Sequence, residues 1–160
     1  AFISTAGGHL LELINDILDL SKIESGKTEL DEREINIKKL FNTCYGYVKQ
    51  SALKKEIKLE IIVPEDIPHL YADQIRVKQI ILNLLSNAIK FTLARGVVQL
   101  SAKVVDEHLI IEVKDNGIGI EDENIEIALS EFGQAANGMD GRTSAEQGSG
   151  LGLPITKKLV

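Results

Sequence analysis

The chain has 160 residues, a formal net charge of −6 and 44% hydrophobic residues, a composition typical of one compact domain with a helical extension. Its 18 basic residues form no long run, which argues against a nucleic-acid surface and against a polybasic membrane anchor. The apolar run 80–85 is too short to span a bilayer. We therefore expect a soluble, cytoplasmic segment, and leave open whether its parent protein is membrane-anchored.

The first 25 residues carry the apolar pattern of a supercoiled helix. Apolar residues recur at alternating spacings of three and four, at Ile3, Ala6, Leu10, Leu13, Ile17 and Leu20. Ile14 and Leu18 widen this seam, which favours a four-helix bundle over a two-stranded coil. We expect residues 1–26 to be one helix of a dimerisation bundle and residues 27–160 to be a separate domain. A terminal helix lying on its own domain is the alternative.

Alternating and helical patterns then follow one another up to residue 120. In chain order they predict a short edge strand at 28–35, a helix at 37–54, a strand at 57–63, a helix from Asp73 to Gly96, and strands at 97–105 and 108–114 joined by Asp106-Glu107. Asp73 is the expected N-cap of the second helix. Cys44, the only cysteine, is expected to be a small packed residue of the first helix.

The last 40 residues predict a loop and a helix. Residues 121–147 are rich in Gly, Asn, Ser, Asp and Ala with few large apolar residues, so we expect a mobile loop there. A final helix is expected from about Leu151. The order of elements predicts an α/β two-layer sandwich, with a mixed sheet covered on one face by three helices and preceded by the long N-terminal helix.

Two glycine-rich tracts stand downstream of a polar stripe on the helix 73–96. The stripe consists of Asn83, Asn87 and Lys90, whose spacings of four and three place them on one face of the helix. The tracts are DNGIGI at 115–120 and GSGLGL at 148–153. A polar stripe on a largely buried helix is costly unless something pairs with it, and a triphosphate with its magnesium ion is such a partner. The three blocks together predict a nucleotide site.

These blocks resemble the N, G1 and G2 boxes of sensor histidine kinases, in the ATPase superfamily shared with gyrase, heat-shock chaperones and mismatch-repair ATPases. Phe132-Gly133-Gln134 is similar to the F box, and residues 11–27 resemble the second bundle helix that leads into the catalytic domain. The resemblance covers nearly the whole chain. It implies the histidine-kinase-type ATPase fold, which in relatives continues with another strand or two.

The resemblance also implies an activity, cofactors and partners. The chain would use ATP and Mg²⁺ and transfer the γ-phosphoryl group to a histidine, for relay to an aspartate of a response regulator receiver domain. The parent would form a homodimer through the N-terminal bundle. The contexts of His9, His69 and His108 differ from that of the phosphoacceptor, so we expect the acceptor to lie outside these 160 residues. A degenerate nucleotide-binding docking module and a gyrase-type ATPase remain as alternatives.

Individual roles follow from the matched boxes. Asn83, Asn87 and Lys90 would be catalytic, with Asn87 as the magnesium ligand, because Mg²⁺ takes amide and phosphate oxygens. Hydrolytic relatives carry Glu where Asn83 stands, and an amide cannot take a proton from water, which favours phosphoryl transfer. Asp115 would accept a hydrogen bond from the adenine amino group. The implied nucleotide-binding set is Asn87, Lys90, Phe91, Asp115, Gly117, Gly119, Ile120, Phe132, Gly148, Ser149, Gly150, Leu151 and Gly152.

Overall fold

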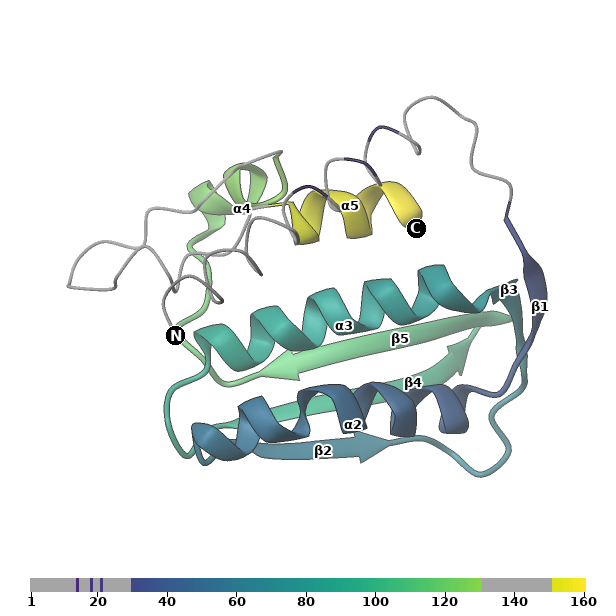
Figure 1. The fold of residues 1–160 in the computed structure, drawn as a ribbon, viewed down its shortest axis with the longest axis horizontal. Coiled ribbons are helices and arrows are strands. Elements are labelled where there is room, and N and C mark those ends of the chain that lie inside the picture. The colour runs from purple at the N-terminus through teal and green to yellow at the C-terminus, as the bar shows by residue number, and fades with distance from the viewer. Residues whose placement is uncertain (1–13, 15–17, 19–20, 22–29, 131–150) are drawn as a thin grey trace. The chain divides into compact units, whose positions relative to one another are not determined.

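The computed structural model describes residues 30–130 and 151–160, together with Ile14, Leu18 and Ser21 (Figure 1). Ile14, Leu18 and Ser21 are helical, in agreement with the predicted N-terminal helix. The rest of that helix, residues 131–150 of the predicted loop, and the proposed boundary at residue 26 lie outside the described residues. The described residues fall into two parts. One is Leu30–Gly119; the other comprises Ile14, Leu18 and Ser21 together with the described residues from Ile120 onward, and each part is described by itself.

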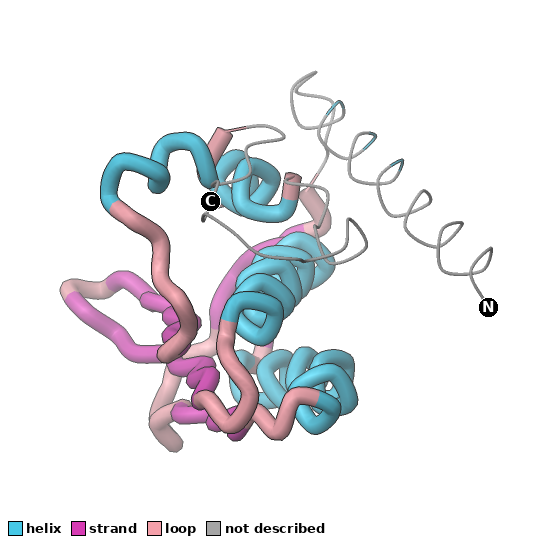
Figure 2. Tube along the Cα trace, turned by 90° about the vertical axis from the view of Figure 1, so that its left-hand side faces the viewer, coloured by secondary structure: helices cyan, strands magenta, loops and turns pink. Residues whose placement is uncertain are grey.

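Residues Leu30–Gly119 form two layers. One layer is a mixed sheet with strand order β2-β4-β5, in which β4 pairs in parallel with β2 and antiparallel with β5. The other layer consists of two helices that lie side by side on one face of this sheet (Figures 1 and 2). The strands are β2 (Lys58–Ile62), β4 (Val97–Val105) and β5 (His108–Asp115), and the helices are α2 (Ile37–Lys54) and α3 (Gln74–Phe91).

Strand alternation sorts the side chains of the sheet into two faces. Val98, Leu100 and Ala102 of β4 are buried, whereas Gln99, Ser101 and Lys103, which alternate with them, are half-buried or exposed. The buried side meets the apolar faces of the two helices, including Phe41 and Cys44 of α2 and Ile81, Leu85 and Ile89 of α3. Cys44 is packed as predicted, and burial raises the pKa of its thiol to about 11.

A separate two-stranded ribbon joins the beginning of this part to the start of α3. Its strands are β1 (Glu32–Ile35) and β3 (Leu70–Asp73), which pair antiparallel with Glu32 opposite Asp73. The predicted edge strand at 28–35 is thereby confirmed over β1. Strand β3 was not predicted from the sequence, because four residues with one exposed and three half-buried side chains carry no clear alternation.

One predicted helix end is wrong. The helix does not continue to Gly96, since α3 ends at Phe91 and Thr92 turns into extended backbone with ψ 136°. Gly96 instead closes the turn before β4, where its N–H donates to the carbonyl of Leu93 at 3.0 Å. A Cβ at Gly96 would lie 2.3 Å from Cγ2 of Thr92, so this turn needs glycine for space.

Among the residues from Ile120 onward that the structure describes are two helices, α4 (Asp122–Ala128) and α5 (Gly152–Leu159). The prediction of a loop throughout residues 121–147 is wrong over α4, whose first turn carries Asp122 and Glu123, the charge sign that a helix N-terminus favours. The predicted final helix is confirmed by α5. The α/β class with a mixed sheet is confirmed, with α2 and α3 covering the sheet; α5, the predicted third helix, belongs to the other part.

Candidate nucleotide-binding site

The polar stripe of α3 forms as the helical spacing predicts. Asn83, Asn87 and Lys90 all lie within α3 and are all half-buried. The core-facing side of the same helix carries the buried residues Ile81, Leu85, Ala88 and Ile89. The Lys90 ammonium lies 5.0 Å from the centroid of the Phe91 ring, a cation–π distance. The structure therefore places amide and ammonium groups together along the second half of α3.

The turn after β5 packs directly onto the C-terminal end of this helix. The backbone N–H of Ile118 donates to the carbonyl of Phe91 at 3.2 Å. A Cβ at Gly117 would stand 2.4 Å from the same carbonyl oxygen, closer than any side chain can approach. Glycine at 117 is thus required for the first glycine tract to reach α3.

Asp115 is the last residue of β5 and is held by the turn that follows it. Its Oδ1 accepts a hydrogen bond from the N–H of Gly117 at 2.8 Å, which fixes the orientation of the carboxylate. Asp115 is otherwise solvent-exposed. The result is an oriented carboxylate at the edge of the sheet, on the same turn that contacts α3.

Asn116 supports this turn and was not singled out by the sequence analysis. Its N–H donates to the carbonyl of Val97 at 3.3 Å, and its Oδ1 accepts from the N–H of Val97 at 2.7 Å. This reciprocal pair continues the β4–β5 ladder one residue beyond Asp115. The signal was present in the Asp-Asn-Gly turn sequence, since Asn side chains commonly bind neighbouring backbone in turns.

Two further features border the turn. Gly119 has φ +71°, and a Cβ built there would have no heavy atom of the described residues within 4 Å, so these residues leave space beside it. Thr92, directly after α3, is only 2% exposed, and its hydroxyl oxygen has no hydrogen-bond partner among the residues that the structure describes. A water or ligand group that hydrogen-bonds a buried hydroxyl in that state offsets the free-energy cost of its burial.

The remaining predicted site residues do not belong to Leu30–Gly119. Ile120, Leu151 and Gly152 belong to the part from Ile120 onward, in which Leu151 is buried and Gly152 begins α5. Phe132, Gly148, Ser149 and Gly150 lie outside the described residues. Their roles at the site stay predictions.

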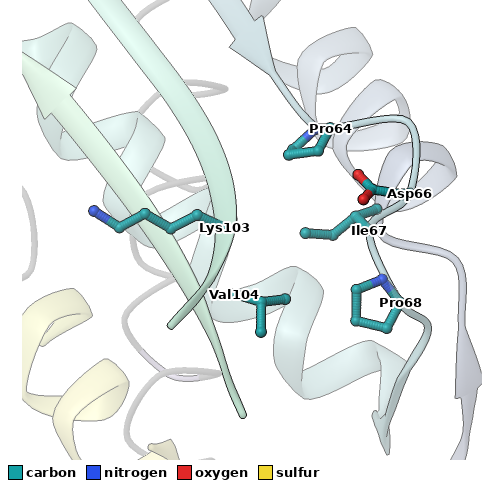
Figure 3. A pocket seen from close by; sticks show the side chains of 6 residues that line it. All are labelled: Pro64, Asp66, Ile67, Pro68, Lys103 and Val104. Carbon is teal, nitrogen blue, oxygen red and sulfur yellow. The ribbon is translucent and has the colours of Figure 1, made fainter. Parts of the chain in front are cut away.

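A hollow of about 280 Å³ lies near the hairpin of β4 and β5 and contains none of the predicted site residues (Figure 3). Its lining consists of Pro64, Asp66, Ile67, Pro68, Lys103 and Val104. The Lys103 side chain points away from the loop that carries Asp66. The hollow therefore combines apolar side chains with the charged residues Asp66 and Lys103, and none of its lining residues belongs to the Asp115 turn.

Two absences among the described residues concern metals and membranes. No group of three or more His, Cys, Asp or Glu side chains is placed to hold a metal ion in this portion of the chain. No helix in the same portion is long and apolar enough to cross a membrane. A magnesium ion held largely by phosphate oxygens needs only one protein ligand, and the amide of Asn87 is chemically suited to that role.

Residues 72–160 match the family described as Histidine kinase-, DNA gyrase B-, and HSP90-like ATPase. The match covers more than half of the chain and includes the helix with the polar stripe and both glycine tracts. The chain belongs to this family and is a nucleotide-binding domain of the ATPase class.

The relatives narrow this class to the histidine kinases. The chain is 41% identical over 160 residues to the circadian input-output histidine kinase CikA of Thermosynechococcus vestitus, covering 99% of this chain and 22% of that protein. Full-length ShkA, solved in complex with AMPPNP, has a TM-score of 0.83 and 30% identity, covering 96% of this chain and 31% of ShkA. The nucleotide-free catalytic domain of histidine kinase ThkA has a TM-score of 0.68 and 26% identity, covering 81% and 79%. The chain is thus homologous to the ATPase catalytic domains of sensor histidine kinases.

Proposed function

We propose that this chain binds ATP with magnesium and transfers the γ-phosphoryl group to a histidine outside residues 1–160, for relay to an aspartate of a response regulator. The observation that carries the proposal is the junction of the Asp115 turn with the end of α3. It joins a group suited to reading adenine and groups suited to holding phosphates within one part of the molecule. The hydrogen bond from Ile118 to Phe91 fixes this junction at 3.2 Å.

Asp115 would select adenine. Its Oδ1 accepts the Gly117 N–H, so Oδ2 is directed for a second hydrogen bond, from the exocyclic amino group of adenine. Guanine has a carbonyl at that position, which a carboxylate repels. The open space beside Gly119 supports this assignment, since a flat base can approach the backbone there.

The stripe on α3 would hold the phosphates. The Asn87 amide oxygen would ligate magnesium, the Lys90 ammonium would bind phosphate oxygens, and Asn83 would hydrogen-bond water around the metal. Magnesium, when bound, neutralises phosphate charge during phosphoryl transfer. Because Asn83 cannot act as a base toward water, the chain's own residues favour transfer to a protein side chain over hydrolysis.

The two histidines that the structure describes both contact neighbouring polar groups. His69 Nδ1 lies 3.2 Å from Oε1 of Glu34, and its Nε2 lies 3.2 Å from the side-chain nitrogen of Asn36. His108 Nδ1 lies 2.7 Å from the carbonyl of Asp106 in the hairpin turn. These contacts support an acceptor histidine elsewhere, on the bundle that residues 1–26 would join as a homodimer.

Calorimetric titration of the chain with ATP analogues, with and without magnesium, tests this function. Adenine nucleotides should bind and guanine nucleotides should not, and magnesium should strengthen binding of the triphosphate. Asn87→Ala should remove the magnesium effect while leaving adenosine binding intact, and Ser86→Ala, at an exposed neighbouring position of α3, is the matched control.

The chain alone should acquire no acid-labile phosphoryl label, whereas a bundle helix bearing the parent's acceptor histidine should acquire it in trans. Equal affinity for adenine and guanine nucleotides, or label on the isolated chain, would contradict the proposal.

A further inference from the structure

The C-terminal end of α3 is held by a lysine from the neighbouring helix. Lys55, the C-cap residue of α2, donates hydrogen bonds from Nζ to the carbonyl of Ile89 at 3.0 Å and to the carbonyl of Lys90 at 2.7 Å. Carbonyls in the last turn of a helix lack intrahelical partners, and a cation is favoured there by the helix dipole. Lys55 therefore supplies both the donors and the charge that this helix end requires.

Three consecutive carbonyls at the end of α3 are thus bound from outside the helix. Lys55 binds those of residues 89 and 90, and the Ile118 N–H binds that of Phe91. One of the two donors comes from the turn that carries Asp115. The other binds the backbone of Lys90, the residue whose side chain we assign to the phosphates.

The backbone of Lys55 is itself anchored without help from its side chain. Its N–H donates to the carbonyl of Ala52 at 3.1 Å, and its carbonyl accepts from the N–H of Arg95 at 3.3 Å. Arg95 Nε also donates to Oε2 of Glu56 at 3.0 Å. These hydrogen bonds join the turn after α2 to the turn after α3. From this junction the Lys55 side chain extends to the carbonyls at the end of α3.

We propose that Lys55 is a positioning residue for the phosphate-binding half of the nucleotide site. It acts through the backbone of Ile89 and Lys90 and holds the last turn of α3 in register with the Asp115 turn. This inference rests on the proposed function, because it assigns Lys90 to the phosphates. Replacing the Lys55 side chain frees two helix-end carbonyls and leaves the anchored turn in place, so the variant is expected to fold.

The test compares Lys55→Met, Lys55→Arg and the control Lys54→Met in the full 160-residue chain. Lys54 is the last residue of α2, and its substitution removes the same charge one position away. Binding of magnesium AMPPNP and of adenosine is measured for each protein by calorimetry and NMR titration, and hydrogen exchange is followed at the amide of Thr92, which donates to Ala88 at 2.9 Å.

Lys55→Met should weaken AMPPNP binding about five- to tenfold, as expected for two lost hydrogen bonds, while adenosine binding changes less than about twofold. Exchange at Thr92 should accelerate, Lys55→Arg should restore the affinity, and Lys54→Met should behave as wild type. Unchanged AMPPNP affinity in Lys55→Met, or an equal loss for both ligands, would overturn the inference. Failure of the wild-type chain to bind adenine nucleotides would instead refute the proposed function.

Discussion

The two ends of α3 are stabilised in different ways. At the N-terminus, the Asp73 side chain accepts hydrogen bonds from the N–H groups of Ile75 at 2.9 Å and Arg76 at 3.2 Å, two and three residues further along the chain. At the C-terminus, the carbonyls are bound by Lys55 and by Ile118, which are distant in sequence. The first end is capped mainly by local hydrogen bonds, with one further bond from the Asp31 N–H to Asp73 Oδ2 at 3.2 Å. The carbonyls of residues 89–91 at the second end are bound by groups from other segments.

The candidate site lies at the end that depends on tertiary contacts. Asn87, Lys90 and Phe91 belong to the last turns of α3, and Asp115 and Gly117 reach them from the end of β5. We therefore expect substitutions at the C-terminal junction to change both stability and nucleotide affinity. Substitutions at the N-terminus of α3 should change stability alone.

The largest effect is expected from Gly117→Ala. A Cβ at this position would lie 2.4 Å from the Phe91 carbonyl oxygen, so the turn would have to move away from the helix. We expect a loss of about 1–3 kcal/mol in the free energy of unfolding, as for other overpacked sites, together with a loss of nucleotide affinity. Denaturant unfolding and calorimetry measure the two quantities.

Gly46→Ala is the control for Gly117→Ala. Gly46 lies in α2, and a Cβ there would have no heavy atom within 4 Å. The substitution should raise stability by about 0.5–1 kcal/mol, because Ala is the better helix former. A Gly117→Ala protein with the stability and affinity of wild type would show that the junction tolerates displacement.

Asp115→Asn should reduce affinity for adenine nucleotides and leave the fold intact. In the native protein the Gly117 N–H donates to Asp115 at 2.8 Å, and the side-chain oxygen of Asn can still accept this hydrogen bond. The NH₂ group of Asn, however, is a donor and cannot accept a hydrogen bond from the adenine amino group. We expect a loss of about 1–3 kcal/mol in binding free energy, measured by calorimetry. Asp106→Asn, in the exposed hairpin turn at the other end of β5, should bind as wild type does. Equal affinity in the Asp115 variant would remove its assigned role.

Asp73→Ala should lower stability by about 1 kcal/mol at neutral pH without changing nucleotide affinity, because it removes the N-cap. Partial burial acts to raise the pKa of the Asp73 carboxyl, but hydrogen bonds from the N–H groups of Arg76, Asp31 and Ile75 outweigh it and lower the pKa below 3.8. The stabilisation is therefore complete above the ordinary carboxyl range and is lost as pH falls through the lowered pKa.

Unfolding curves recorded from pH 7 downward test the Asp73 prediction. The stability difference between wild type and Asp73→Ala should be constant near neutrality and should shrink below about pH 4, where carboxyl groups begin to take up protons. Glu65→Ala, at an exposed position before β3, should show no such difference. A difference that grows toward low pH would contradict the assigned hydrogen bonds.

Asn116→Ala should give the smallest effect, about 0.5 kcal/mol of stability, because it removes one solvent-exposed hydrogen bond, from the Val97 N–H at 2.7 Å. The backbone hydrogen bond from Asn116 to the Val97 carbonyl remains possible. Hydrogen exchange at Val97 should accelerate, and adenine affinity should fall slightly as Asp115 loses support. An unchanged Val97 amide would show that the side-chain bond contributes nothing.

Much of the fold could be predicted because its signals are local. The helix 37–54 and the strands at 97–105 and 108–114 follow from the period of their apolar residues, which matches the buried faces of α2 and β4 and the half-buried face of β5. The N-cap role of Asp73 and the stripe of Asn83, Asn87 and Lys90 are also consequences of short-range spacing. Each of these features depends on residues within a few positions of one another.

The rest depended on contacts between segments that are far apart in the chain. The short strand β3 is defined by its pairing with β1. Helix α3 ends at Phe91, whose carbonyl accepts a hydrogen bond from Ile118, and does not continue to Gly96. Lys55 donates to the carbonyls of residues 89 and 90, more than thirty residues further along the chain. No periodic pattern in the sequence predicts this contact. The sequence by itself determined which side chains could bind a nucleotide. Tertiary structure decided how the turn that carries Asp115 is joined to the helix end, because backbone hydrogen-bonding groups are common to nearly every residue and acquire partners only when the chain folds.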